Sequence, residues 1–431
     1  MRTALWGYGI YGKRIYTLMK KYSPQTEITG IYDMAHAGEK ADGLTIADPE
    51  QITRDFADGL FENVMVCVNL EQTCIEILTK LKDSHIPVYT PCSDADFVPA
   101  EEIAGVSEKE SGQPGYRMYA FRNLRGMTTA PSSAVMYLFD ASGHHLKEQW
   151  DAYSVKEVWT HIYDLPVNTH SIQPETVFMS GSYCILAKLW AFNYSHFSFE
   201  SMDCIQLMEE AGFTGRYVVP ERSYIRELLQ IYGIPDERIL TLGDFTPGVC
   251  YEFEEVHYPK LMQNDRHYSA PVLKRMAERI QKKLTLNHDK YPRYLYVKRV
   301  GIRKLLNGEE IAERYGFDVM IPEEHSLLEQ MNYYYNADIV FSPHGANNAT
   351  TLYMRPEAAM VETFGRNWVK YSYLYVLHEK GTYYLPVVEG PIMPEFIKSS
   401  NDRGADYTID ETNLQAALDI AFRLTGNTQK K

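Results

Sequence analysis

The sequence lacks the cysteine patterns that mark metal sites and disulfide frameworks. Its six cysteines, at positions 67, 74, 92, 184, 204 and 250, are scattered along 431 residues without a Cys-x-x-Cys pair. Closely spaced cysteines are what structural zinc sites and small disulfide-rich folds require. We therefore expect reduced, mostly buried thiols and no metal site built from them.

Long apolar stretches and basic runs are also missing. No stretch of about 18 apolar residues occurs, and the first residues lead directly into a strand-and-glycine pattern. We expect a cytoplasmic protein that is neither exported nor membrane-spanning, with peripheral association with a membrane assembly left open. The formal net charge is −14 and no stripe rich in lysine and arginine is present, which argues against nucleic acid as a partner.

The chain nevertheless has enough apolar material for several domains. Its residues are 45% hydrophobic, and its length suits two or three domains. Alternating strand and helix signals predict an α/β fold. We predict a Rossmann-like domain over residues 1–105 and two further α/β lobes over residues 106–275 and 276–431, the last of which ends in a helix that packs back. The sequence leaves the oligomeric state open.

The predicted elements follow from hydrophobic periodicity and from glycine and proline positions. The predicted strands are residues 3–6, 27–33, 63–68, 87–90, 215–219, a strand around 240, 251–257, 293–299, 317–321, 338–342 and 359–364. The predicted helices are residues 13–21, 71–82, 194–211, 223–232, 308–315, 326–336, 347–354 and 410–424. Residues 100–116 are rich in Glu, Ser, Gly and Pro, which predicts a loop or linker.

A glycine fingerprint opens the first domain. Gly7, Gly9 and Gly12 follow a strand and begin a helix, which is the arrangement that directs backbone amides and the helix dipole at a pyrophosphate. Asp33 ends the next strand 21 positions after Gly12, where an acid can accept from a ribose hydroxyl. Two interpretations stay open: a site for NAD or another nucleotide, and glycines that only permit tight packing of strand against helix.

His196 and Glu200 stand at positions i and i+4 of a predicted helix that begins near Asn193. This spacing places the two side chains on one helix face, where they could form a proton-handling pair. The alternative is a capping Asn193 followed by a helix whose His196 is satisfied in the core.

A basic turn follows a predicted strand further along the chain. Lys298, Arg299, Arg303 and Lys304 supply four cations within seven residues. Arginine donors at such a turn suit a diphosphate, and Arg299 and Arg303 are the leading pair. The alternative is a solvated basic loop.

A third segment, Asp338–Ala349, ends a buried strand at Pro-His-Gly-Ala and begins a helix. His344 and the helix N-terminus should then lie at the carboxyl edge of a parallel sheet, where ligands bind. Glu362 ends the adjacent strand and could accept from a ribose, or could pair with a neighbouring arginine.

Taken together and in this order, these three segments resemble the signatures of glycosyltransferase family 61, over roughly residues 150–395. The resemblance implies a two-lobed GT-B fold, with residues 106–275 as the acceptor-side lobe and residues 276–431 as the donor-nucleotide lobe. It also implies a nucleotide-sugar donor such as UDP-xylose or UDP-N-acetylglucosamine, inversion of the anomeric centre and no metal. Two departures from the family pattern bear on the donor sugar and on the acceptor geometry. After the histidine of the third segment, the chain has Gly-Ala-Asn where many members have Gly-Ala-Gly. Beyond the histidine of the first segment, the aromatic residue is Phe197 in place of Trp. By resemblance, the donor would be held by Lys298, Arg299, Arg303, Asn307, His344, Gly345, Ala346, Asn347 and Glu362.

The expected reaction is transfer of a sugar from a UDP-linked donor to a glycan, a cell-surface polysaccharide such as a capsule, or a lipid-linked saccharide. His196, slightly favoured, or Glu200 would act as the base. The sole Asp-x-Asp, Asp94–Asp96, lies near the end of the first domain and is expected to cap a turn. Two alternatives stay open: an NAD-dependent oxidoreductase or epimerase acting on a sugar nucleotide, which lacks a placed Tyr-x-x-x-Lys pair, and a non-catalytic nucleotide-sugar-binding protein.

Overall fold

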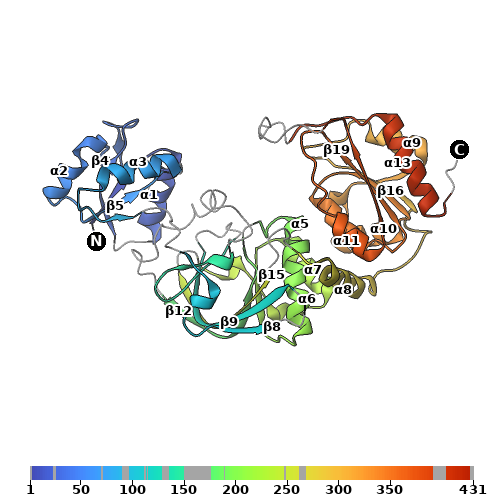
Figure 1. Ribbon diagram of the computed structural model, residues 1–431, viewed down its shortest axis with the longest axis horizontal. Helices are drawn as coiled ribbons and strands as arrows, with labels where there is room; N and C mark the ends of the chain where they lie inside the picture. The colour runs from blue at the N-terminus through green and yellow to red at the C-terminus, as the bar shows by residue number, and fades with distance from the viewer. Residues whose placement is uncertain are drawn as a thin grey trace. The chain divides into compact units, whose positions relative to one another are not determined.

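The chain folds into several β-sheets with packed helices, a mixed α/β architecture (Figure 1). The computed structural model describes residues 2–22, 26–68, 71–89, 97–110, 113, 115–128, 135–149, 176–188, 190–246, 249–261, 268–391 and 404–427. Two compact units are present. The first comprises Met1–Leu189, Thr214–Glu221 and Arg238–Asn264, and the second comprises Trp190–Phe213, Arg222–Glu237 and Asp265–Lys431.

The first unit begins with a parallel sheet in the order β2-β1-β5-β6. This confirms the predicted parallel α/β alternation, with ends that differ by a few residues. The sheet and its surroundings are built from β1 (Arg2–Trp6), α1 (Ile10–Tyr22), β2 (Glu27–Tyr32), β3 (Lys40–Ala41), β4 (Leu44–Thr45), α2 (Ile52–Ala57), β5 (Asn63–Val66), α3 (Glu71–Leu81) and β6 (Val88–Tyr89).

A second sheet of this unit runs β14-β13-β12-β15-β9-β10-β11-β7, with β8 paired to β9. The predicted strands near 215–219, 240 and 251–257 are confirmed as β13, β14 and β15. The bounds in this sheet are β7 (Phe97–Val98), β8 (Ser107–Glu110), β9 (Tyr116–Met127), β10 (Tyr137–Phe139), β11 (His145–Leu146), β12 (Thr176–Ile185), β13 (Arg216–Val219), β14 (Ile239–Thr241) and β15 (Cys250–Leu261).

The prediction of a loop over residues 100–116 is wrong. A 3₁₀ turn at Ala100–Glu102 and the strand β8 occupy this segment. β8 pairs antiparallel with β9, a strand that was also not predicted. Backbone hydrogen bonds to β9 stabilise a polar strand such as β8, and its own side chains give no hydrophobic pattern from which it could be predicted.

The second unit contains a fully parallel sheet in the order β17-β16-β18-β19-β20. In chain order this is 2-1-3-4-5, a doubly wound arrangement whose direction reverses between β16 and β18. The central strands β18 and β19 are buried along their whole length, as expected for a sheet covered on both faces. The strands are β16 (Tyr294–Val297), β17 (Asp318–Met320), β18 (Ile339–Pro343), β19 (Ala359–Phe364) and β20 (Tyr383–Val388).

The helices of this sheet begin and end at residues suited to caps. Ser326 accepts from the backbone of Glu329 at the start of α10, and Gly316 ends α9 with a φ of 72°. The predicted helix over 347–354 is a 3₁₀ helix, η10, and not an α-helix. The helical segments are α9 (Gly308–Tyr315), α10 (Leu327–Asn336), η10 (Ala346–Tyr353), α11 (Leu374–Lys380) and α13 (Glu411–Leu424).

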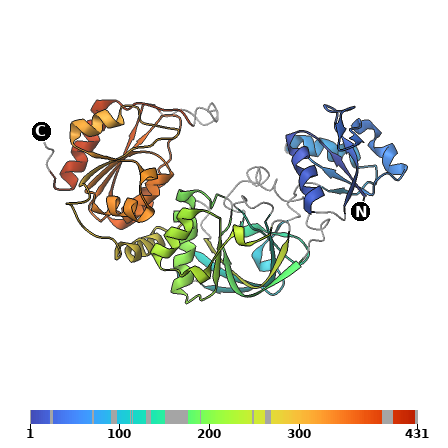
Figure 2. The same ribbon diagram turned by 180° about the vertical axis from the view of Figure 1, so that it is seen from behind.

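One face of this sheet is covered by α9 and α13, the orange and red helices that lie side by side when the molecule is seen from behind (Figure 2). Ile311 of α9 and Leu414 and Leu418 of α13 share an apolar core with strand residues of the sheet. The final helix packs against β19 and β20.

Four further helices belong to this second unit although they lie earlier in the chain. α5 (Tyr194–His196) continues through a π-helical segment (Phe197–Ser201) into α6 (Met202–Glu210), followed by α7 (Ser223–Tyr232) and α8 (Ala270–Gln281). α5 packs against η10, and α7 packs against α8 and α10. The predicted helices over 194–211 and 223–232 are therefore confirmed. The domain boundary predicted between residues 275 and 276 falls inside α8.

Five cysteines, at positions 67, 74, 184, 204 and 250, are free and buried, as predicted; Cys92 lies outside the described residues. Among the described helices, none is both long and apolar enough to cross a bilayer.

Candidate functional site

The basic turn after β16 contains two kinds of cation. Lys298 forms an ion pair with Glu309, with 2.8 Å between Nζ and Oε2. Lys304 does the same with Asp406, at 3.2 Å between Nζ and Oδ2. These two lysines match the alternative of a solvated basic loop, because each charge already has a carboxylate partner.

The two arginines of the turn differ from the lysines. Arg299 and Arg303 are half-buried, and neither guanidinium forms an ion pair with a carboxylate among the described residues. Burial lowers the pKa of both side chains, and for Arg303 the positive charge of Arg299 lowers it further. Nε of Arg303 is buried without a hydrogen-bond partner in the described part of the chain. Two adjacent cations without counter-charges are suited to a multiply charged anion.

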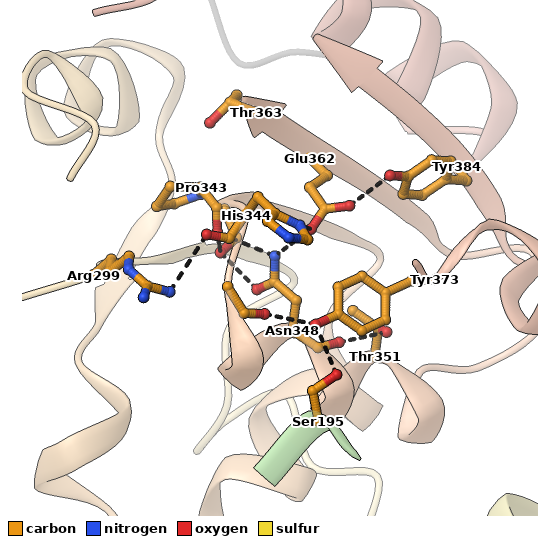
Figure 3. A network of polar contacts seen from close by, with 12 residues as sticks. Ser195, Arg299, Pro343, His344, Asn348, Thr351, Glu362, Thr363, Tyr373 and Tyr384 are labelled. Carbon is orange, nitrogen blue, oxygen red and sulfur yellow. Dashed lines mark hydrogen bonds and ion pairs between the residues drawn. The ribbon is translucent and has the colours of Figure 1, made fainter. Parts of the chain in front are cut away.

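Arg299 also connects the turn to the segment after β18. Its Nη1 donates to the backbone oxygen of His344 at 3.3 Å (Figure 3). Its Nε donates to the backbone oxygen of Ile302. A Cβ on Gly345 would lie 1.6 Å from Nη1 of Arg299. A side chain at position 345 would therefore displace the guanidinium of Arg299 from its place over the loop.

His344 is held by a buried carboxylate beneath it. Its Nδ1 lies 2.8 Å from Oε1 of Glu362, which is 0% exposed. Glu362 also accepts from Asn348 at 2.8 Å and from the hydroxyl of Tyr384 at 2.5 Å (Figure 3). A hydrogen on Nδ1 directed at Glu362 leaves Nε2 of the neutral imidazole as an acceptor.

The remaining residues of the predicted donor set lie around these groups. Ala346 and Asn347 are the first residues of η10 and are half-buried. Asn307 is used within the fold, because its side chain exchanges two hydrogen bonds with the backbone of Ile409. Glu362 has three donors already and lies below the surface, so its contact with a ribose stays a prediction that this geometry does not favour.

A pocket of about 210 Å³ opens at the carboxyl edge of the sheet. It is lined by residues that follow β16, β18, β19 and β20, namely Arg303, His344, Gly365, Arg366, Asn367, Trp368, Glu389, Ala405, Asp406 and Tyr407. This is where doubly wound sheets bind ligands, next to the point where the strand order reverses. Arg299, which follows β16, and His344, which follows β18, meet across that point.

His196 and Glu200 form the predicted pair. Nδ1 of His196 lies 2.6 Å from Oε1 of Glu200, and the histidine side chain remains 37% exposed. Asn193 caps the helix by accepting from the backbone of Ser195 and His196, so the capping interpretation and the pairing interpretation hold together. The pair lies at a π-helical segment, a distortion that is frequent at functional sites.

A tyrosine links the helix of His196 to the loop of His344. Tyr373 is buried, and its hydroxyl donates to the oxygen of Gly345 at 2.7 Å and lies 3.3 Å from Oγ of Ser195 (Figure 3). Burial raises its pKa, so the hydroxyl keeps its proton. The residue beside His196 is thus joined by one hydroxyl to the loop that follows β18.

The glycine fingerprint of the first unit has a defined local geometry. Gly7 adopts a φ of 108°, and a Cβ on Gly12 would lie 2.0 Å from the oxygen of Gly7, so both positions need glycine for packing. Gly9 faces open space. Asp33 does not stand free: one carboxylate oxygen accepts from the backbone of Tyr8 at 2.5 Å, and the other accepts from two amides that follow it.

Sequence reasoning missed Asn367, Trp368, Tyr373, Tyr384 and Glu389. These residues belong to no short motif, and tyrosine occurs 33 times in the chain, so a single tyrosine carries no signal. Asp94–Asp96 lies outside the described residues. Within the described ranges, no group of three or more His, Cys, Asp or Glu side chains is arranged to hold a metal ion.

Comparisons with known proteins place part of the chain in a family. No curated protein matches the sequence. Among solved structures, RSP, a Rex-family repressor, is 16% identical over 21% of this chain and 46% of its own, so this chain spans about half of that protein, with a TM-score of 0.20. UDP-D-quinovosamine 4-dehydrogenase from Vibrio fischeri is 16% identical over 22% of this chain and 80% of its own, with a TM-score of 0.19. These two likenesses are too low to bear on function.

The match to a family model is the informative comparison. The model of glycosyltransferase 61 matches residues 167–361, a range that includes the His196 pair, the basic turn and the His344 loop. The resemblance predicted from those three segments is thereby confirmed. Over residues 167–361, this chain matches the family model of glycosyltransferase 61.

Proposed function

We propose that the protein transfers a sugar from a nucleotide-sugar donor, UDP-linked in our proposal, to a hydroxyl of a glycan or of another cell-surface saccharide. The observation that carries this proposal is the pair of half-buried guanidiniums, which have no carboxylate partner among the described residues, beside His344 at the carboxyl edge of a doubly wound sheet. Such a site favours the diphosphate of a donor. The family match supports the reaction class.

The leaving group is the nucleoside diphosphate in this mechanism. As the bond between the anomeric carbon and the diphosphate oxygen breaks, negative charge develops on that oxygen and positive charge on the sugar ring. Arg299 is held in place by the backbone oxygens of Ile302 and His344, and its charge acts on nearby Arg303, so we propose that the two cations stabilise this negative charge with little reorganisation. We propose on this basis that the transfer requires no metal ion and proceeds in a two-lobed GT-B arrangement.

The acceptor is activated by His196 in the same proposal. Glu200 holds the hydrogen of Nδ1, which leaves Nε2 of the exposed imidazole as the proton acceptor. The acceptor oxygen forms the new bond to the anomeric carbon from the side opposite the diphosphate, and its proton passes to Nε2. A single displacement of this kind inverts the anomeric centre.

Binding of UDP tests the proposal before any acceptor is known. We expect UDP at about 100 times its dissociation constant to stabilise the protein by about 2.7 kcal/mol, measured as a thermal shift. The Arg299→Ala variant should lose most of that shift. A UDP-sugar should then release UDP only when a competent acceptor is supplied. A response to NAD without any response to UDP would contradict the proposal and move the chemistry to the first unit.

The oxidoreductase alternative has no comparable support. One oxygen of Asp33 accepts from the amide of Tyr8 in the glycine loop and the other accepts from the amides of Ala35 and His36, so the carboxylate that would accept from an NAD ribose has a structural role already.

A further inference from the structure

Two carboxylates line the pocket at the edge of the sheet, and one of them is fully engaged. Asp406 accepts from the backbone of Lys304 through Oδ1 at 2.8 Å and faces Nζ of the same lysine through Oδ2 at 3.2 Å. These contacts keep the pKa of Asp406 below its usual value. Both oxygens of Asp406 therefore serve to hold the basic turn.

Glu389 is the second carboxylate and is only half engaged. It follows directly after β20, and its backbone N–H donates to the oxygen of Phe364 at 2.9 Å. Its Oε2 accepts from the backbone of Arg366 at 3.1 Å. In the part of the chain that the structure describes, Oε1 has no hydrogen bond and Glu389 has no ion pair. One oxygen thus fixes the side chain, and the other remains available to a donor in the pocket.

The remaining walls of the pocket suit a nucleoside. The indole of Trp368 lies 5.8 Å from the guanidinium carbon of Arg303, and both residues line the pocket. Oδ1 of Asn367 is buried without a partner among the described residues. Beside a diphosphate site, the indole of Trp368 suits the face of a base and the amide of Asn367 suits its polar edge. The carboxylate of Glu389 suits the ribose. The volume of about 210 Å³ is below the ~300–1,000 Å³ of whole-ligand sites and suits one such part of a donor.

We propose that this pocket binds the nucleoside of the donor and that Glu389 accepts a hydrogen bond from a ribose hydroxyl through Oε1. The inference rests on the proposed function, because it takes the diphosphate to lie at Arg299 and Arg303. It assigns to Glu389 the ribose contact that the sequence suggested for Glu362, whose carboxylate is buried under His344. Glu362 lies in β19, whereas Glu389 directly follows β20, the neighbouring strand of the same sheet.

Calorimetric titration of the full-length protein with UDP, 2′-deoxy-UDP and 3′-deoxy-UDP tests the assignment. A hydrogen bond from a hydroxyl to a carboxylate should make the wild type bind UDP about 10-fold to 100-fold more tightly than at least one of the deoxy ligands. Glu389→Gln should weaken UDP by a similar factor and remove the preference. Asp406→Asn, the matched change at the other carboxylate, should affect UDP and the deoxy ligands equally.

The possible results separate a failure of the Glu389 assignment from a failure of the proposed donor site at Arg299 and Arg303. A Glu389→Gln variant that retains the wild-type preference would overturn the assignment of Glu389. A wild type that binds UDP and both deoxy ligands equally would overturn it without any variant, so the test does not depend on the variant's folding. Two other results would instead overturn the proposed donor site itself. In the first, the wild type binds no UDP. In the second, it binds UDP and Arg299→Ala leaves the affinity unchanged.

Discussion

Replacing Arg303 with methionine should weaken donor binding while leaving the ligand-free protein at least as stable. The guanidinium is half-buried, lacks a carboxylate partner among the described residues and has an unsatisfied Nε. Burial of an unpaired polar group costs roughly 1–3 kcal/mol, a cost that methionine removes while it retains an unbranched apolar side chain along the stem of the arginine. A lost charge-assisted hydrogen bond to the diphosphate costs about 1.5–3 kcal/mol, which raises the dissociation constant for UDP about 10-fold to 150-fold.

Two measurements check this prediction: calorimetric titration with UDP, and urea unfolding without ligand. Lys298→Met is the control, because the ammonium of Lys298 is already paired with Glu309 and a surface pair contributes about 0–1 kcal/mol. The control should change UDP affinity by less than about 3-fold. The reasoning is refuted if Arg303→Met leaves UDP affinity unchanged, or if it destabilises the ligand-free protein as strongly as it weakens binding.

Four further substitutions test other parts of the site. His196→Ala should reduce kcat by about 10²–10⁴ with UDP affinity unchanged, and near-wild-type turnover would exclude it as the base. Tyr373→Phe should reduce kcat more than it changes KM, because the ring stays and the link to Gly345 is lost; equal effects on both would contradict this. Gly345→Ala should abolish UDP binding, since its Cβ would meet Arg299, and retained affinity would show that the loop can shift. Lys380→Met should flatten the pH dependence of stability between pH 7 and 10, as measured by urea unfolding.

The sign of the Lys380 effect follows from its environment. Burial lowers the pKa of Lys380 from 10.5 to about 7, against the attraction of Glu278, while its Nζ donates to the oxygens of Leu352 and Met354. Between these pKa values the unfolded chain binds the proton and the folded chain does not. The free energy of unfolding therefore rises with pH in this window, by up to about 1.4 kcal/mol per pH unit. An unchanged slope in the methionine variant would show that Lys380 is charged in the fold.

Local sequence patterns predicted the parallel sheets well. They predicted poorly the antiparallel pairing of β8 and β15 with β9 in the first unit. In the parallel sheets, buried runs such as Ile339–Pro343 and capped helices such as Gly308–Tyr315 are set by residues close together in the chain. β9 and β15 instead pair over twelve-residue strands that are far apart in the sequence. β8 is polar and has no apolar face to detect. Such strands are stabilised by pairing with strands that are distant in the sequence. A short stretch of sequence therefore does not show that they form.

The candidate site divides in the same way. Arg299, Arg303 and His344 were predicted because each follows a strand within a short segment of distinctive residues. Tyr373 and Glu389 were not, because each enters the site through tertiary packing and stands in an ordinary local sequence. The sequence also could not separate free cations from paired ones, since that distinction depends on Glu309 and Asp406.

The discontinuous second unit has a consequence for synthesis of the chain. α5, which carries His196, packs against η10, yet η10 ends at Tyr353, 157 residues after His196 (353 minus 196). At about 5–20 residues per second, a ribosome needs roughly 8 to 30 seconds to supply that partner. Throughout this interval the apolar side chains of Phe197 and Met202, which the finished fold buries completely, lack their final surroundings. We therefore expect the segment that bears the proposed base to be accessible to chaperones on the nascent chain, and the site to be assembled only after most of the protein has been made.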